Sequence, residues 1–345
     1  MLYVTTRSRW NSYTAQWALT KDRAEDGGFF VPMTLPQFTR EQIDALSEQS
    51  FYATVAQVLN QFFSTDLTEQ NVRFVLGHTP VKLVDVSHRL VAGETWHNSA
   101  GSFTYFAEKL CRQIQQNSGE YSGLRNWPEI AARIAFLFGF FGQLQKQGRV
   151  SVEKTMDVVT AAGDFTAPMA AWYARKMGLP IGVIVCGCNE NGAPWELLHR
   201  GELRTSASTV VTDLPLADHA LPDGLERLLN AALGDKAVGE YLTTCERGGL
   251  YVPEELDFQQ LRQGVFVSVV GRRRLDMSIL NVYTTNSYIL GPYAALGYAG
   301  CTDLRAISGG SPTAVLLCDR SPMLDKEYLC RVMAISETTL QNRLK

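Results

Sequence analysis

The stretch WHNSAGSFTY, residues 96–105, brings together side chains that can act on a small molecule. His97 is followed by small residues, and Phe103 stands just before the helical run FAEKLCRQIQQ. This order is typical of a loop that presents one side chain to a pocket from the start of a helix. Thr104 occupies that place, and its hydroxyl forms hydrogen bonds but cannot form an imine.

Further candidates follow two predicted buried strands. Open α/β sheets bind ligands at the carboxyl ends of their strands, so the turns after these strands are the predicted site. After the strand MDVVTAA stand Gly163, Asp164, Phe165, Thr166 and Ala167, and the strand AVLLC leads to Cys318 and Asp319. Each candidate also has a purely structural explanation: Asp164 as a helix N-cap, Asp319 in a solvated turn, Tyr293 as a packed aromatic residue, His97 as a hydrogen-bonded loop residue, and Cys318 as the last residue of a strand.

The elements that must position these residues alternate strand and helix. Residues 156–190 contain a buried strand, a turn, a helix that ends at Gly178-Leu179-Pro180, and the second buried strand IGVIVCGC. This order predicts a βαβ unit with parallel strands. Residues 126–149 predict a helix buried on most faces, and residues 278–300 predict one helix before the strand TAVLLCD. The sequence therefore predicts an α/β fold.

Cysteine usage does not indicate a disulfide framework, because the seven cysteines are spread through a long chain. Cys186 and Cys188, with His199 downstream, leave a metal site as an alternative. However, VIVCGC is typical of a buried parallel strand in which cysteine replaces a small apolar residue. Core packing is the preferred interpretation, and no metal site is predicted.

Composition bounds the class of protein. The chain has 345 residues, of which 46% are hydrophobic and 19% charged, enough for one large domain and a smaller one. The formal net charge of −3 argues against a nucleic-acid partner. We find neither a signal peptide nor an apolar stretch of about 18 residues, and therefore expect a cytoplasmic protein without membrane contact.

A local cluster of positive charge, Arg272, Arg273 and Arg274, stands at a predicted helix start, where the helix dipole disfavours cations. This placement favours a use for the cluster, namely binding of a small anionic ligand or of an acidic partner. A solvated turn is the alternative.

Five fragments in order along the chain resemble threonine synthase, a pyridoxal phosphate enzyme of fold type II. They are DGGFFVP at 26–32, NW at 126–127, YARKMGLP at 173–180, NEN at 189–191 and PDGLERLL at 222–229. The resemblance implies a tryptophan synthase β-like large domain with a parallel-rich sheet, residues 96–345, and a small N-terminal subdomain, residues 1–95. Between Lys109 and Asn126 the family carries a small α/β domain that holds the substrate carboxylate. Here only LCRQIQQNSGEYSGLR stands between them, so we expect this domain to be deleted near residues 110–125.

The resemblance also explains the opening stretch. Residues 97–105 match the family pattern HGPTLAFKD at His97 and Phe103, and Thr104 stands at the position of the family's lysine. In the family this lysine forms an imine with the cofactor and transfers the proton. Lys109 is a poor replacement, because it lies about 7.5 Å further along the helix and points in another direction.

Other cofactor contacts of the family are altered as well. The phosphate cup GNFGN corresponds to residues 163–167, where Asp164 places a carboxylate at the phosphate position and Thr166 replaces a glycine. The family's DPHTA corresponds to GPYAA at 291–295, which contains Tyr293. The residue that meets the pyridine nitrogen corresponds to about Asp319, which is able to pair with a protonated ring nitrogen.

Three functions compete. The preferred interpretation is a threonine synthase-like protein that has lost catalysis and has a binding or regulatory role, as a homodimer or as a heteromer with an active relative. An enzyme of altered chemistry in the same pocket is the second, with acid–base roles for His97, Asp164, Tyr293, Asp319 and Cys318. An active lyase acting on O-phosphohomoserine is the third. No cofactor is expected, and pyridoxal phosphate is expected only if the family function is retained.

Overall fold

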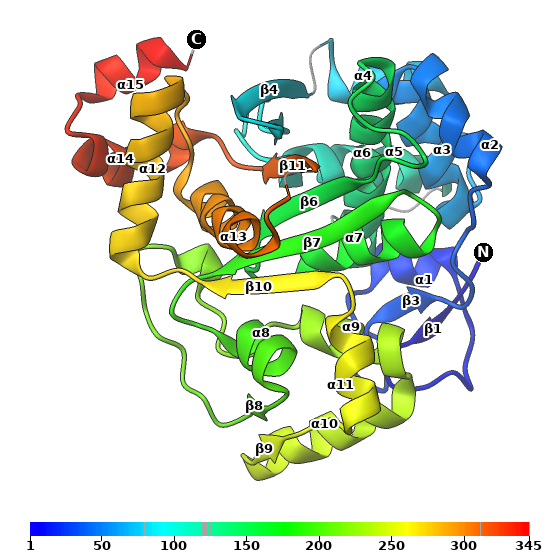
Figure 1. Ribbon diagram of the computed structural model, residues 1–345. Coiled ribbons are helices and arrows are strands. Elements are labelled where there is room, and N and C mark those ends of the chain that lie inside the picture. The colour runs from blue at the N-terminus through cyan, green and yellow to red at the C-terminus, as the bar shows by residue number, and fades with distance from the viewer. Residues whose placement is uncertain (79–80, 119–122, 124–125, 311, 345) are drawn as a thin grey trace.

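A six-stranded sheet forms the centre of the protein (Figure 1). The computed structural model describes residues 1–345 except 79–80, 119–122, 124–125, 311 and 345. The strand order is β10-β7-β6-β11-β5-β4, and every neighbouring pair is parallel except the edge pair β4–β5. The strands are β4 Lys82–Ser87, β5 Leu90–Glu94, β6 Met156–Ala161, β7 Ile181–Cys188, β10 Val265–Val269 and β11 Thr313–Cys318. A mostly parallel α/β sheet confirms the predicted fold class.

Helices cover both faces of this sheet, so successive strand residues are buried in two different cores. Val158 and Ile184 point to the core that contains α3, Phe51–Phe63, α6, Asn126–Lys146, and α7, Thr166–Lys176. Their neighbours Val159 and Val185 point to the core under α12, Arg272–Asn286, α13, Pro292–Ser308, and α14, Lys326–Met333. Burial on both faces explains why these strands are continuous apolar runs.

Helix α13 lies very close to the sheet. A Cβ atom at Gly187 in β7 would lie 2.0 Å from the Leu296 carbonyl oxygen, and one at Gly297 would lie 2.9 Å from the Thr160 backbone. Because no side chain fits between these backbones, glycine is required on both sides of the contact.

The predicted βαβ unit is confirmed, since β6, α7 and β7 follow in order and the two strands pair in parallel. The single helix predicted for residues 278–300 is wrong, because α12 ends at Asn286 and α13 begins at Pro292. Ser287 takes a left-handed conformation with φ of 54°, and a proline at the first helical position cannot continue a preceding helix.

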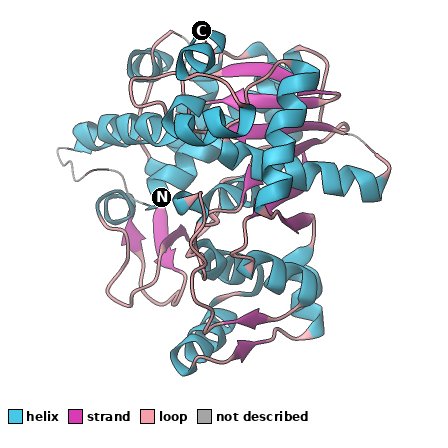
Figure 2. Ribbon diagram, turned by 90° about the vertical axis from the view of Figure 1, so that its left-hand side faces the viewer, coloured by secondary structure: helices cyan, strands magenta, loops and turns pink. Residues whose placement is uncertain are grey.

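The N-terminal residues form a small antiparallel sheet of β2, β1 and β3 beside the main body (Figure 2). Its strands are β1 Leu2–Thr5, β2 Tyr13–Thr14 and β3 Phe30–Pro32. A division of the chain at residue 95 stays a prediction, although β4 and β5 carry this segment into the main sheet. The deletion expected near residues 110–125 falls partly outside the described residues. The described chain runs in α5, Phe103–Ser118, and resumes in α6 at Asn126.

Further α-helices and strands surround these layers. They are α1 Ala15–Thr20, α2 Arg40–Asp44, α4 Glu69–Leu76, α8 Ala193–Trp195, β8 Leu203–Arg204, α9 Gly224–Leu233, α10 Asp235–Arg247, β9 Leu250–Tyr251, α11 Glu255–Arg262 and α15 Glu337–Arg343. Four short helices are η1 Ala45–Glu48, η2 Glu196–Arg200, η3 Pro215–Ala217 and η4 Pro322–Asp325.

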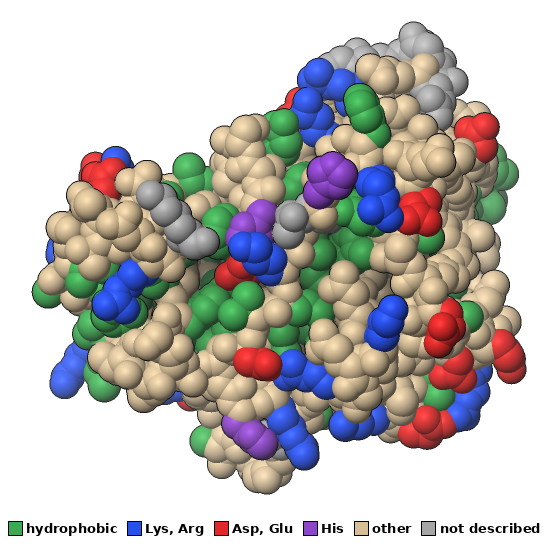
Figure 3. Space-filling model, turned by 90° about the horizontal axis from the view of Figure 1, so that it is seen from above, with side chains coloured by type: hydrophobic (Ala, Val, Ile, Leu, Met, Phe, Trp, Pro, Cys, Tyr) green, Lys and Arg blue, Asp and Glu red, His purple; other side chains and the backbone are tan. Residues whose placement is uncertain are grey.

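The face seen from above is hollowed, and hydrophobic side chains gather in its middle (Figure 3). The edge strand β4 lies at this side of the sheet (Figure 1). Its exposed Lys82 and Asp85 place charges along the free edge, which disfavours pairing with a further strand. Within the described part of the chain, no helix is both long and apolar enough to cross a membrane.

Candidate functional site

The loop after β5 and the turn after β11 are joined at the carboxyl edge of the sheet. The Phe103 N–H donates to the Asp319 carbonyl oxygen at 2.7 Å, and the Thr95 hydroxyl donates to Asp319 Oδ1 at 2.8 Å. Thr104 follows in the first turn of α5 and is exposed, whereas Phe103 is buried. Thr104 therefore lies at the start of a helix, but it is not among the residues that line the cavity at Asp319.

The turn after β6 engages one N–H group at the start of α7 with its own carboxylate. Gly163 and Phe165 have φ values of 49° and 68°, which turn the chain sharply into α7. The Thr166 backbone N–H donates to Asp164 Oδ1 at 2.9 Å, and the Thr166 hydroxyl donates to Asp164 Oδ2 at 2.7 Å. The first N–H groups of a helix form a site for anions, and here the Asp164 carboxylate binds one of them. The N-cap of α7 is Phe165, so the N-cap position considered for Asp164 is wrong; Asp164 lies one residue earlier and closes a turn through Thr166.

Asp319 is paired with a cation that sequence analysis did not identify. Its Oδ2 forms an ion pair with Arg133 of α6, and Arg133 also pairs with Glu129 Oε1 at 3.1 Å. The Arg133 guanidinium lies 4.2 Å from the centre of the Phe103 ring. The Arg133 side chain is only 12% exposed, so the pair is largely removed from water.

Burial and charge oppose each other in this ion-pair network. Burial works against the charge of Arg133, but Asp319 and Glu129 outweigh it and raise the pKa of the guanidinium. Burial raises the pKa of the Glu129 carboxyl, against the nearby Arg133, and the negative charge of Asp164 acts in the same direction as burial. Glu129, Arg133, Asp164 and Asp319 thus act on one another electrostatically.

His97 belongs to a neighbouring cluster. Its Nε2 lies 2.7 Å from Glu94 Oε2, and its ring stacks on Trp96 at 4.1 Å between centroids. The Tyr288 hydroxyl donates to Glu94 Oε1 at 2.8 Å and lies 3.8 Å from Cys318 Sγ. Burial raises the pKa of both the Tyr288 hydroxyl and the Cys318 thiol. The last residue of β5, Glu94, therefore holds His97 through a buried carboxylate.

Tyr293 and Asp319 line a small cavity at the ends of β6 and β11. The Leu216 N–H donates to the Tyr293 hydroxyl at 3.4 Å, and burial raises the pKa of that hydroxyl. The cavity volume is about 70 Å³, and three of its lining residues, Tyr293, Arg320 and Asp325, also line an adjoining hollow of about 580 Å³.

These residues do not fit pyridoxal phosphate. The anion-binding start of α7 is engaged by Asp164, the carboxylate of Asp319 is engaged by Arg133, and Thr104 offers a hydroxyl where an amine is required. Lys109 Nζ lies 5.3 Å from the centre of the Tyr105 ring. At these three positions, which the sequence resemblance assigns to the cofactor, the groups have a partner within the protein or lack an amine.

Cys186 and Cys188 are buried in β7, and burial raises the pKa of both thiols. In the described ranges, no group of three or more His, Cys, Asp or Glu side chains is placed to hold a metal ion.

Four residues of the two clusters were not predicted from the sequence: Glu94, Glu129, Arg133 and Tyr288. A signal was available for two of them. Glu129 and Arg133 are spaced i, i+4 within a helix that is otherwise apolar, which predicts a pair on one face. Such a pair in a buried helix requires a polar partner, here Asp319.

Comparison with known proteins supports the resemblance found in the sequence. Residues 2–79 match the family described as threonine synthase N terminus. The chain is 26% identical to threonine synthase-like 1 of Macaca fascicularis over 175 residues, which are 50% of this chain and 23% of that protein. It is 25% identical to the threonine synthase of Pseudomonas aeruginosa over 252 residues, or 68% of this chain and 52% of that enzyme. The matched regions thus span about half or less of these curated relatives.

Solved structures show the same fold. The threonine synthase of Brucella melitensis with bound pyridoxal phosphate superposes with a TM-score of 0.85 at 18% identity, covering 97% of this chain and 92% of that one. The yeast threonine synthase gives a TM-score of 0.84 at 16% identity, covering 97% and 90%. The resemblance to threonine synthase and the fold type II architecture are confirmed.

Proposed function

We propose that this threonine synthase-like protein has lost pyridoxal phosphate-dependent catalysis and acts by binding. The observation that carries the proposal is the engagement of the Thr166 N–H by the Asp164 carboxylate at 2.9 Å. A phosphate at this helix start would compete with a tethered carboxylate of like charge. Thr104 supports the same conclusion, since a hydroxyl cannot form an imine with the cofactor aldehyde.

The small cavity at Asp319 supports the proposal from a different direction. Its Asp319 carboxylate, which the resemblance places at the pyridine nitrogen, is held by Arg133. Cofactor binding would therefore have to break a buried ion pair.

An enzyme of altered chemistry is the second candidate, and the cluster around Glu94 favours it. A buried carboxylate that holds both an imidazole and a phenol is an arrangement used in proton transfer. The cluster is a weaker basis for a function, because neither His97 nor Glu94 is among the residues that line the cavity at Asp319.

The direct test titrates the purified protein with pyridoxal phosphate and follows the visible absorbance of the bound cofactor. The same protein is assayed for phosphate release from O-phosphohomoserine, with the threonine synthase of Pseudomonas aeruginosa as positive control. We expect neither cofactor absorbance nor phosphate release. Phosphate release by the unmodified protein would refute the loss of catalysis and favour the active lyase.

We further propose that the protein associates with itself or with an active relative. The support is the shared fold alone, which makes the surfaces that such enzymes use for assembly available to this chain. Analytical ultracentrifugation of the protein, alone and mixed with a threonine synthase from the same cell, tests this. A monomer in both samples would rule the association out.

A further inference from the structure

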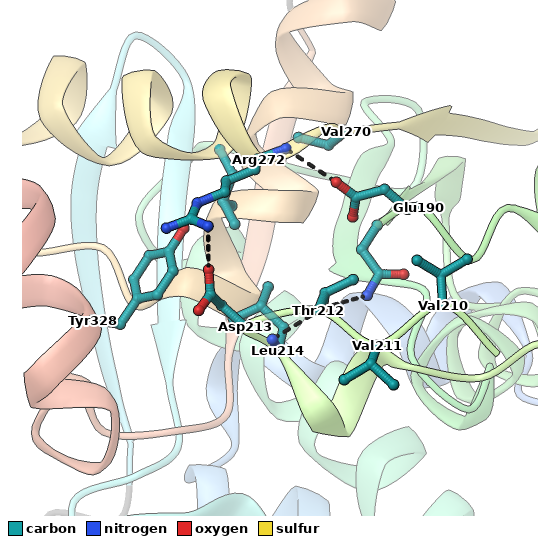
Figure 4. A pocket seen from close by; sticks show the side chains of 11 residues that line it. Glu190, Val210, Val211, Thr212, Asp213, Leu214, Val270, Arg272 and Tyr328 are labelled. Carbon is teal, nitrogen blue, oxygen red and sulfur yellow. Dashed lines mark hydrogen bonds and ion pairs between the residues drawn. The ribbon is translucent and has the colours of Figure 1, made fainter.

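Another hollow, larger than the cavity at Asp319, lies at the carboxyl ends of β7 and β10, beside α14 (Figure 4). Its volume is about 320 Å³, within the range of small-molecule sites. The residues that line it and those that line the cavity at Asp319 are two separate sets. The carboxyl edge of a parallel sheet is where such folds bind ligands. This hollow is therefore a candidate site distinct from the altered cofactor pocket.

Positive and negative charges meet at one side of the hollow. Asp213 Oδ2 lies 3.2 Å from Arg272 Nη1 and 3.4 Å from Arg331 Nη2. An arginine side chain carries five N–H donors, so the contact of Arg272 through Nη1 leaves donors for a second carboxylate. The Arg272 side chain is 60% exposed, which leaves its guanidinium accessible from the hollow.

A carboxylate stands on the other side. Glu190 follows β7, and its Oε1 accepts from the backbone N–H of Arg272 at 3.3 Å. Figure 4 shows the Glu190 side chain and the Arg272 guanidinium at separate places on the rim, with open space between them. The second oxygen of Glu190 is able to accept from a bound cation.

The rest of the wall is apolar. Val270 and Leu275 are buried beneath the hollow, while Val210 and Val211 are 49% and 88% exposed beside it. In Figure 4 both valines lie on the same side as Glu190. An apolar group in the hollow would therefore cover valine side chains that now face water.

We infer that this hollow binds a free α-amino acid with an apolar side chain. Its carboxylate binds the guanidinium of Arg272, its ammonium group binds the carboxylate of Glu190, and its side chain packs on Val210 and Val211. A ligand with both charges matches the two opposite charges on the rim, whereas a simple anion would meet Glu190 and Asp213 with like charge. The inference goes beyond the loss of catalysis and does not depend on it, because the two pockets share no lining residue.

Isothermal titration calorimetry of the full chain with leucine tests the site. Two analogues each remove one charge: 4-methylpentanoate lacks the ammonium group, and 3-methylbutylamine lacks the carboxylate. We expect leucine to bind at least tenfold more tightly than either analogue and than inorganic phosphate. Each analogue leaves one charged group of the protein unpaired, and this weakens binding.

Variants locate the binding site. Arg272→Gln and Glu190→Gln are each expected to weaken leucine binding at least tenfold, and both residues are exposed, so the fold is retained. Arg273→Gln is the matched control. It removes one positive charge from the same turn of α12, but Arg273 is not among the residues that line the hollow. Circular dichroism checks that each variant is folded.

Three outcomes would overturn the inference: no leucine binding at millimolar concentration, equal binding of leucine and 4-methylpentanoate, or equal loss of binding in Arg273→Gln. Binding of phosphate alone would assign the arginines to a simple anion instead. None of these outcomes bears on the cofactor titration, so the two proposals succeed or fail separately.

Discussion

Replacing Arg133 by methionine removes the cation of the buried network at the end of β11 while keeping an unbranched side chain. Arg133 and Asp319 are 12% and 24% exposed, so Asp319 would remain as a largely buried carboxylate without its cation. Breaking a buried ion pair costs roughly 3–5 kcal/mol. The hydrogen bond from Thr95 at 2.8 Å and the residual exposure of Asp319 moderate this cost. We therefore expect the free energy of unfolding to fall by about 3 kcal/mol, at the lower end of that range.

Urea unfolding of four proteins measures the coupling: the parent, Arg133→Met, Asp319→Asn and the double variant. We expect a coupling free energy of about 2 kcal/mol, because the arginine loses most of its value once the carboxylate is neutral. Lys236→Met is the control, since Lys236 is 88% exposed and pairs with Glu240 on the surface at 3.6 Å, so its loss costs less than about 1 kcal/mol. A coupling below about 0.5 kcal/mol would refute the ion-pair argument.

Three further predictions concern the altered pocket, its pH dependence and the sheet. Thr104→Lys alone is expected to release no phosphate from O-phosphohomoserine, whereas adding Asp164→Asn and Thr166→Gly is expected to produce cofactor absorbance without turnover; turnover by the single variant would contradict this. Burial raises the pKa of Glu129 above its ordinary value of 4.5, so the folded state holds this proton more tightly and stability falls as pH rises from 4.5 through the raised pKa. Urea unfolding across this range should show a smaller fall in Glu129→Gln, and equal pH dependence in both proteins would count against the burial argument. Gly187→Ala is expected to lower the free energy of unfolding by about 3 kcal/mol or to prevent folding, because a Cβ there would lie 2.0 Å from a carbonyl oxygen of α13, and an unchanged urea midpoint would show that the helix can move away.

The strands and the central helix were predictable because their signals are local. The βαβ unit is visible as two buried runs around a helix with a glycine and a proline at its end, and α6 as an apolar run too long for a strand. The break between α12 and α13 was also marked locally, by Gly291-Pro292, but the apolar residues on both sides concealed it. Short-range chemistry fixes where a helix ends, and a continuous apolar pattern is not evidence against such an end.

The partners of the site residues were not predictable in the same way. Sequence analysis placed Asp319 at the end of a strand and left open whether it faces solvent or a ring nitrogen. Its actual partner, Arg133, is contributed by a helix 186 positions earlier in the chain. Only the packing of α6 against the elements around α5 and α7 brings the two charges together, and no spacing rule reports that. The same holds for Glu94 and Tyr288, which lie 194 positions apart.

The internal contacts of Asp164 and Asp319 have a common physical consequence. In a ligand pocket, a helix start and a carboxylate can be left unpaired so that the ligand binds them. Without the ligand, these unpaired groups lower the stability of the folded protein. Here Asp164 engages one N–H at the start of α7 and Arg133 pairs with Asp319, so both groups have partners within the protein. Asp164→Asn, which restores the family residue of the phosphate cup, would remove one of these charged partners before the other cofactor contacts are complete. This single reversion is therefore expected to cost stability without a gain in binding, which favours retention of the scaffold with its pocket internally paired.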